Sequence, residues 1–203
     1  MRDISIPDLR DPQRNEADQA IYDLGLSMQV DLSPAALIDR AIAVTGSRDF
    51  GQTGVLDRCE VLVEAVNADS GLSGIGRYLV RKRLLELLTA RLRFEEFTKR
   101  NPESCEVELE PPVIVVGLPR SGTTHLVNLL AVDSRFRSMP WWEVKEPIPI
   151  AGEGPGRDGV DPRFRRCERE HAAELQAAPL AALMHDRPPT SIEEECELMD
   201  LDI

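Results

Sequence analysis

The sequence predicts an α/β fold in which a helical region precedes a unit built on a parallel sheet. One observation is the stretch PVIVVGLPRSGTTHL at residues 112–126, where four β-branched residues lead into a turn bounded by glycines and then a helix-compatible segment. A short run that is apolar at every position suits a parallel strand covered on both faces. The other observation is that the chain before residue 102 carries helix signals. We therefore divide the chain into a helical N-terminal region, residues 1–105, and a sheet-bearing unit, residues 106–203.

The composition is that of an ordinary globular chain, with 42% hydrophobic and 30% charged residues over a length of 203, enough to bury a core. The formal net charge is −12. Such an acidic chain is a poor match to nucleic acid or to an anionic membrane surface over a broad face. We therefore expect no nucleic-acid partner, and we expect any bound anion to be held locally by backbone amides and a few arginines.

The cysteines and the N-terminus bear on metal binding and location. The 4 cysteines form neither a CxxC pair nor a Cys/His cluster, so we expect no metal site and free thiols in a reducing compartment. The first residues, MRDISIPDLRDPQR, lack the apolar core of a signal peptide, and no apolar run approaches the length that spans a membrane. We expect a cytoplasmic protein without a transmembrane segment.

In the N-terminal region, helices are expected over residues 16–29, 34–46, 55–68 and 74–100. Ser33 followed by Pro34 is a start signal, because serine is a favoured N-cap and proline fits the first helical position. Ser73 caps the long last helix, and Asn101 with Pro102 ends it, since the residue before a proline is biased away from helical geometry.

In the second unit, the pattern changes from helices to strand, loop and helix. The expected elements are a strand at 113–116, a helix from residue 122 to about 130, a short second strand at 136–139, a loop rich in proline and glycine at 146–160, a helix that begins at 161–162, and a final helical pattern near the C-terminus.

The turn between Gly117 and Gly122 predicts an anion site. Such a turn aims successive N–H groups and a helix N-terminus at one point, where a phosphate can bind. The frame matches the generic phosphate loop GxxxxGK[ST], but Thr123 stands where that loop has lysine. In nucleoside-triphosphate sites the lysine reaches the terminal phosphates, so its replacement argues against ATP or GTP hydrolysis. Arg120 offers a cation inside the loop instead.

The run GLPRSGTT at residues 117–124 closely resembles the 5′-phosphosulfate-binding loop of the sulfotransferases, and the chain resembles bacterial sulfotransferase-family proteins with a helical N-terminal region. Trp142, Glu143, Pro147 and Pro149 agree with a downstream segment of that family. The resemblance implies a P-loop nucleotide-hydrolase-like parallel sheet with helices on both faces. It also implies transfer of a sulfuryl group, without a metal, from 3′-phosphoadenosine 5′-phosphosulfate to a hydroxyl group of a small-molecule acceptor.

By the same resemblance, the 5′-phosphate of the donor is held by the loop residues Pro119, Arg120, Ser121, Gly122, Thr123 and Thr124. Arg120 has a catalytic role as well, because it contacts the bridging oxygen and the leaving phosphate while negative charge develops there. An interaction that strengthens in the transition state accelerates the reaction.

A base is also needed, because a neutral hydroxyl is a poor nucleophile. Our candidate is Glu143, which follows the expected second strand and would reach the same carboxyl edge of the sheet as the loop. The alternatives are that Glu143 is a surface acid and that His185 is the base. Trp141 and Trp142 are expected either to wall the acceptor pocket or to pack in a core.

The family resemblance leaves one part of the donor site without a counterpart. The family's chain continues past the point that matches Ile203, and we find no segment that would grip the 3′-phosphate. We therefore expect that the apolar residues Leu198, Met199, Leu201 and Ile203 lack a core. We expect a truncated chain, poor donor affinity and either aggregation or association with another chain, with a homo-oligomer as the alternative source of the missing strands.

Two further functions stay open from the residues alone. The chain is an alternative candidate for another P-loop enzyme, such as a small-molecule kinase or a nucleoside-triphosphate-binding protein, and tight magnesium-dependent ATP binding would favour it. It is also a candidate for a non-catalytic helical interaction protein with a decayed loop. A stable fold that binds neither nucleotide would point to that role.

Overall fold

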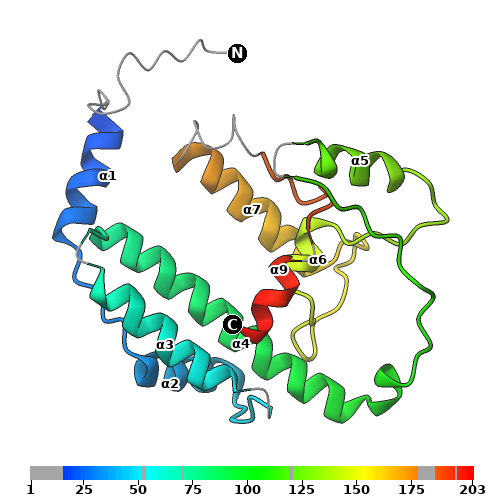
Figure 1. The fold of residues 1–203 in the computed structure, drawn as a ribbon, viewed down its shortest axis with the longest axis horizontal. Coiled ribbons are helices and arrows are strands. Elements are labelled where there is room, and N and C mark those ends of the chain that lie inside the picture. The colour runs from blue at the N-terminus through cyan, green and yellow to red at the C-terminus, as the bar shows by residue number, and fades with distance from the viewer. Residues whose placement is uncertain (1–15, 52–53, 70, 119–120, 178–185, 195) are drawn as a thin grey trace.

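The computed structural model describes residues 16–51, 54–69, 71–118, 121–177, 186–194 and 196–203. Its helices in chain order are α1 (Glu16–Ser27), α2 (Pro34–Thr45), α3 (Val55–Ala68), α4 (Gly74–Arg100), α5 (Thr123–Leu130), α6 (Trp141–Lys145), α7 (Pro162–Ala177) and α9 (Cys196–Met199), and 3₁₀ turns span Pro102–Cys105 and Asp200–Asp202. Figure 1 shows α4 running through the middle, with α2 and α3 on one side of it and α7 on the other.

The helices of the N-terminal region begin where the sequence signals predict. The Ser33 hydroxyl accepts a hydrogen bond of 3.2 Å from the backbone N–H three residues later, so α2 starts at Pro34. Ser73 caps α4 in the same way, also at 3.2 Å. Gly46 ends α2 in the left-handed conformation, at a φ of 77°, which costs glycine little because it has no Cβ. These local signals are confirmed.

The largest core lies among α2, α3 and α4. Its buried side chains are those of Leu32, Leu37, Ala41, Phe50, Val55, Cys59, Val63, Leu84, Leu88 and Leu92. The start of α4 lies directly against the end of α1, because a Cβ on Gly74 would come within 2.2 Å of the Gly25 carbonyl oxygen. Glycine is therefore required at that crossing.

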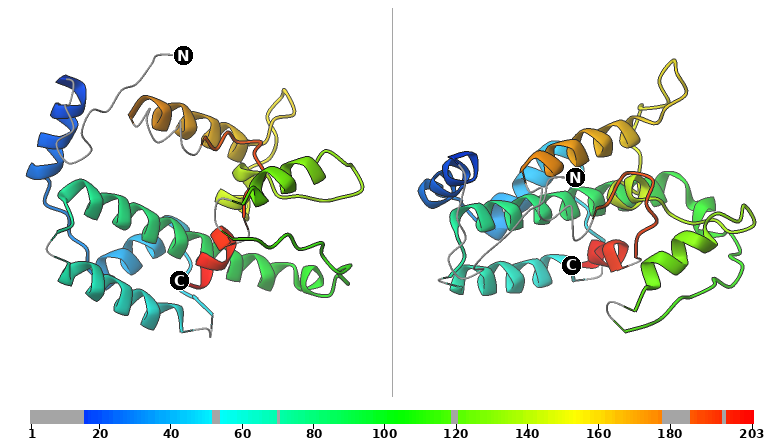
Figure 2. Two further views of the ribbon diagram at one scale, coloured as in Figure 1. Left: turned by 45° about the horizontal axis from the view of Figure 1, so that its top comes forward. Right: turned by 90° about the horizontal axis from the view of Figure 1, so that it is seen from above.

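A second, smaller core holds α6, α7 and α9 together. Trp141, Val144 and Cys167 are buried in it. The run at residues 186–194, which turns at 189–190, lies beside α6, as Figure 2 shows from two further directions. The Trp141 N–H donates to the Ser191 carbonyl at 2.8 Å, so this run closes over the start of α6.

The C-terminal residues pack on both cores. Leu198 packs against the smaller core and Ile203 against the larger one, while Met199 is 74% exposed. Arg83 of α4 holds this segment through ion pairs of 2.8 Å to Glu197 and 2.7 Å to Asp200. The expectation that the terminal apolar residues lack a core is therefore wrong for Leu198 and Ile203.

The α/β prediction of a P-loop nucleotide-hydrolase-like parallel sheet is wrong for this structure. Neither 113–116 nor 136–139 forms a strand, and the β-pairing within the described residues is one isolated antiparallel bridge between Pro140 and Ile192. Val113, Ile114 and Val116 are 65%, 74% and 86% exposed. A strand exists only where a neighbouring segment takes its backbone hydrogen bonds, and no described segment does so for this run. The division into units at residues 105 and 106 stays a prediction.

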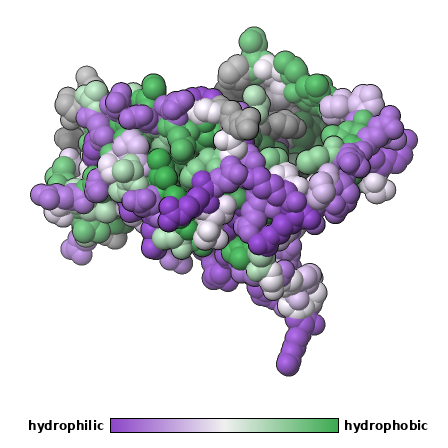
Figure 3. Space-filling model, turned by 90° about the horizontal axis from the view of Figure 1, so that it is seen from below, coloured by the Kyte–Doolittle hydropathy of each residue, from purple (hydrophilic) through white to green (hydrophobic). Residues whose placement is uncertain are grey.

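The exposed apolar run gives one side of the molecule a hydrophobic surface. Leu118, Leu129 and Val132 add to it with exposed fractions of 80%, 56% and 83%. Figure 3 shows hydrophobic surface on the right-hand side of the face seen from below, which is the side where Figure 1 places α5. The residues chosen by sequence as a buried strand are thus on the surface.

None of the helices in the described ranges is long and apolar enough to cross a membrane. The described residues also hold no group of three or more histidine, cysteine, aspartate or glutamate side chains placed to share a metal ion.

Candidate functional site

The described part of the glycine turn has the backbone geometry that a tight loop requires. The Ser121 N–H donates to the Leu118 carbonyl at 3.1 Å, which closes a turn. A Cβ on Gly117 would lie 2.6 Å from the Ser121 hydroxyl oxygen, so a larger residue would push the turn open. Gly122 adopts a φ of 93° and is the N-cap of α5.

The start of α5 is free of side-chain capping. Gly122 has no side chain to accept from the first turn, and no side-chain cap hydrogen bond is present there. The first N–H groups of a helix have no intrahelical acceptor, and the helix dipole adds partial positive charge at the same end. Ser121 and Thr124 are exposed and Thr123 is half-buried. This end of α5 therefore has the donors that an anion needs. Pro119 and Arg120 lie outside the described residues.

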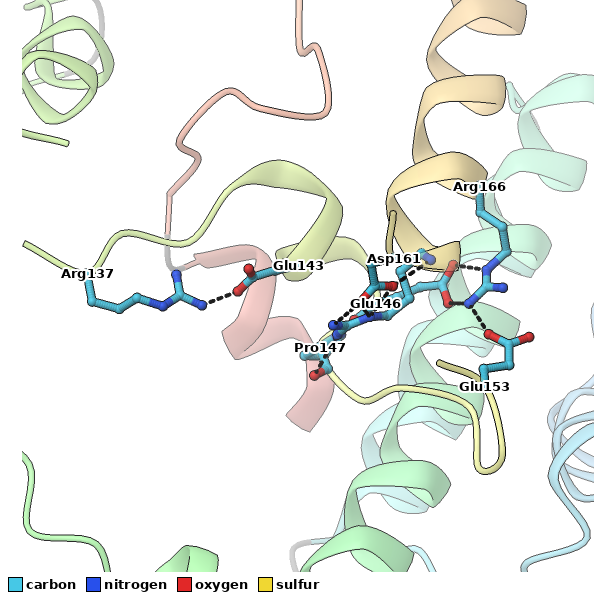
Figure 4. A network of polar contacts seen from close by, with 8 residues as sticks. Arg137, Glu143, Glu146, Pro147, Glu153, Asp161 and Arg166 are labelled. Atoms are coloured by element: carbon cyan, nitrogen blue, oxygen red, sulfur yellow. Dashed lines mark hydrogen bonds and ion pairs between the residues drawn. The ribbon is translucent and has the colours of Figure 1, made fainter. Parts of the chain in front are cut away.

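Glu143, the candidate base, lies in the first turn of α6. Its side chain is 20% exposed and forms an ion pair with Arg137, which is 68% exposed. Figure 4 shows the Glu143 side chain pointing toward Arg137. Glu146 and Arg166 lie on the other side of α6, away from Glu143. The sequence pattern did not indicate Arg137 as a partner. The other candidate base, His185, lies outside the described residues.

The structure links the helix after the loop to the helix that carries Glu143. Asn128 of α5 accepts from the Ile192 N–H and donates to the Ile192 carbonyl, each at 3.1 Å. The next residue back, Ser191, accepts from the start of α6. Sequence reasoning missed Asn128, whose one signal was a polar amide within an apolar helix.

The two tryptophans have different surroundings. Trp141 is buried in the smaller core, with the Arg187 guanidinium 4.7 Å from its ring centroid. Trp142 lines a cavity of about 290 Å³ between α4, α6 and α7, and Arg163 lies 4.8 Å from its ring centroid. The core alternative is therefore confirmed for Trp141, while a role for Trp142 in acceptor binding stays a prediction.

An ion-pair network borders this cavity. Arg166 donates to Glu146 at 2.7 and 2.8 Å and forms an ion pair with Glu153 at 2.9 Å, as Figure 4 shows. These hydrogen bonds, first of all the one to Glu146, raise the pKa of Arg166 above its usual value. Cys167 lies behind the network, where burial raises the pKa of its thiol to about 11. The wall therefore combines a charged network with a buried neutral thiol.

Comparisons with known proteins agree on one family. Residues 111–201 match the model of the sulfotransferase family, and a search of curated proteins found no match. Among solved structures, sulfotransferase STF1 from Mycobacterium tuberculosis is 26% identical at a TM-score of 0.70, with coverage of 86% of this chain and 48% of that one. Sulfotransferase STF9 from Mycobacterium avium is 23% identical at a TM-score of 0.72, with coverage of 87% and 45%. The chain thus spans about half the length of these two proteins.

Proposed function

We propose that this chain is a member of the sulfotransferase family. On that premise, it transfers a sulfuryl group from 3′-phosphoadenosine 5′-phosphosulfate to the hydroxyl group of a small-molecule acceptor. The observation that carries the proposal is the turn at residues 117–124. Its sequence, GLPRSGTT, falls inside the segment that matches the family model. Its glycines take the close approach and the positive φ that such a turn needs.

The donor's 5′-phosphate would bind at the uncapped start of α5. Backbone N–H groups from Gly122 to Thr124 would donate to its oxygens, with the threonine hydroxyls beside them. The Ser121 N–H, which donates to the Leu118 carbonyl, would have to turn from it to join them. Arg120 would contact the oxygen that bridges phosphorus and sulfur. As that bond breaks, the negative charge moves onto the leaving phosphate, where a guanidinium stabilises it most.

Glu143 would remove the acceptor's proton as its oxygen bonds to sulfur. The oxygen–sulfur bond to the donor phosphate breaks in the same exchange, and adenosine 3′,5′-bisphosphate leaves. In the structure Glu143 is paired with Arg137, so this carboxylate would have to turn from the guanidinium to the acceptor hydroxyl. No metal enters the scheme. The free, buried thiols of Cys59 and Cys167 are consistent with the expected reducing, cytoplasmic compartment.

The test is transfer of labelled sulfate from the donor to a panel of phenols and alcohols. We expect Arg120→Ala to lower the rate by roughly 10²–10³-fold, as for loss of one donor at a developing negative charge. Arg157→Ala is the matched control, because Arg157 is an exposed arginine in a loop after α6. Equal rates in both variants would contradict the assignment. Tight magnesium-dependent ATP binding without sulfate transfer would favour the kinase alternative.

A further inference from the structure

The cavity between α4, α6 and α7 has the properties of a small-molecule site. Its volume of about 290 Å³ lies near the lower end of the range for ligand pockets, roughly 300–1,000 Å³. The apolar part of its lining comes from several segments, with Leu85 and Ala90 on α4, Trp142 on α6, and Ile148 and Ile150 on the loop that follows. A compact apolar group therefore has hydrophobic contacts on more than one side.

The charged side chains that line the cavity are almost all paired with other groups of the protein. Each cation in these pairs has a carboxylate partner, and Arg166 has two, Glu146 and Glu153, so none of them leaves a positive charge for a ligand to neutralise. The pairs are Glu86 with Lys82 at 3.0 Å, Arg163 with Asp161 at 2.8 Å, Arg166 with Glu146 at 2.7 Å, and Lys145 with Glu170.

Arg93 is the exception in this wall. It lies on α4, lines the cavity and is half-buried. Within the described part of the chain, its guanidinium has no hydrogen-bond or ion-pair partner. A guanidinium carries five N–H donors and stays charged at any ordinary pH. A half-buried cation that has no counter-ion among the described residues, beside a partly apolar cavity, is complementary to an anion that has an apolar body.

We propose that this cavity binds an organic anion with one charged group, a carboxylate or a sulfonate, on a compact apolar body. The charged group pairs with Arg93, and the body lies against Trp142 and the isoleucines of the loop. The site is separate from the proposed chemistry, because Glu143 points to the other side of α6 (Figure 4). Binding of an anion in this cavity can therefore be tested independently of sulfuryl transfer.

The probe pair is 2-naphthoate and 2-naphthalenemethanol, which share an apolar body and differ in charge. We expect calorimetric titration of the 203-residue chain to show one saturable site for the carboxylate, and at least tenfold weaker binding of the alcohol. Arg93→Gln should weaken carboxylate binding at least tenfold. Arg81→Gln, on the same helix but away from the cavity, should leave it unchanged. Equal affinity for the two probes would overturn the proposal, and so would carboxylate binding that Arg93→Gln does not alter.

A second variant tests the cavity without removing a charge. Ala90→Leu places a larger side chain in the wall and should abolish binding of the carboxylate, while thermal unfolding confirms that the variant is folded.

If Arg93→Gln fails to fold, Arg93→Lys serves in its place. It keeps the positive charge but loses the planar guanidinium, so it should weaken carboxylate binding less than tenfold. Undiminished binding in Ala90→Leu, or no binding to the unaltered protein, would refute the site.

Discussion

The side-chain amide of Asn128 pairs with the backbone of Ile192 as a neighbouring strand would, with one hydrogen bond accepted and one donated, each at 3.1 Å. A single side chain thereby ties α5 to the run that also contacts α6. It is one contact that connects the helix of the candidate donor site to the run beside the helix of Glu143.

Loss of that contact should loosen the second half of the molecule. We expect Asn128→Ala to lower the free energy of unfolding by roughly 1–3 kcal/mol, because two partly buried hydrogen bonds are lost at about 0.5–1.5 kcal/mol each. Asn128→Asp keeps the acceptor but sets a carboxylate oxygen against the carbonyl oxygens of Ile192 and Thr124, so its loss should be at least as large. Urea denaturation measures both variants. An unchanged free energy of unfolding in either variant would contradict this account.

The backbone of the loop can be tested with a matched pair of glycines. Gly122 and Gly152 have φ values of 93° and 84°, and a Cβ on either would meet nothing within 4 Å. Alanine at each position should therefore cost a similar amount, about 1 kcal/mol, through backbone conformation alone. If the start of α5 holds the donor phosphate, only Gly122→Ala should also weaken binding of adenosine 3′,5′-bisphosphate in a calorimetric titration. Equal weakening by both variants would argue against that site.

The buried Arg91 is expected to be the most costly charged residue to remove. It donates to the Phe50 carbonyl at 3.0 Å and forms ion pairs of 2.6 Å with Glu95 and 3.0 Å with Asp202. Arg91→Met removes the partner of the Phe50 carbonyl and of Glu95, while Asp202 keeps an ion pair of 3.6 Å with Arg58. Breaking a buried pair such as that with Glu95 costs about 3–5 kcal/mol. The control is Arg100→Met, whose side chain is 63% exposed in its pair with Glu96, and whose loss should cost less than about 1 kcal/mol. Chemical denaturation compares the two, and equal losses would be the contrary result.

Two carboxylates should make opposite contributions to the pH dependence of stability. Burial alone would raise the pKa of Glu170, but the hydrogen bond and charge of Lys145 lower it below 4.5. Its stabilising effect is thus present above pH 4.5 and is lost as the pH falls through the lowered folded-state pKa. Glu170→Gln should destabilise the protein at pH 7 and have a smaller effect in acid.

Glu193 should behave in the reverse way, because burial raises its pKa above 4.5 despite a hydrogen bond from Ser191. The protonated form favours folding, so its contribution is present below pH 4.5 and is lost as the pH rises through the raised folded-state pKa. We expect Glu193→Gln to be more favourable to stability at pH 7 than at pH 4. Thermal unfolding at the two pH values measures both variants. If the effect on stability changed in the same direction between pH 4 and pH 7 for Glu170→Gln and Glu193→Gln, the opposite contributions of the two carboxylates would be contradicted.

The sequence by itself determined the helices of the N-terminal region and the glycine turn. The observed starts of α2, α3 and α4 fall where capping residues and apolar spacing predict, because a helix takes its hydrogen bonds from its own neighbours in the chain. The left-handed glycine at residue 122 is local in the same sense. The resemblance to the sulfotransferase family, too, was recognisable from a short run of residues, since the loop sequence is specific.

Only the tertiary structure decided the rest. Residues 113–116 have the composition of a buried strand and yet lie exposed and unpaired among the described residues, because strand formation depends on a second segment that no local pattern supplies. The same holds for the pair of Arg137 with Glu143, the link from Asn128 to Ile192, and the cavity that Arg93 lines without a counter-ion from the described part of the chain. Each depends on which distant side chains meet, and sequence spacing does not encode that.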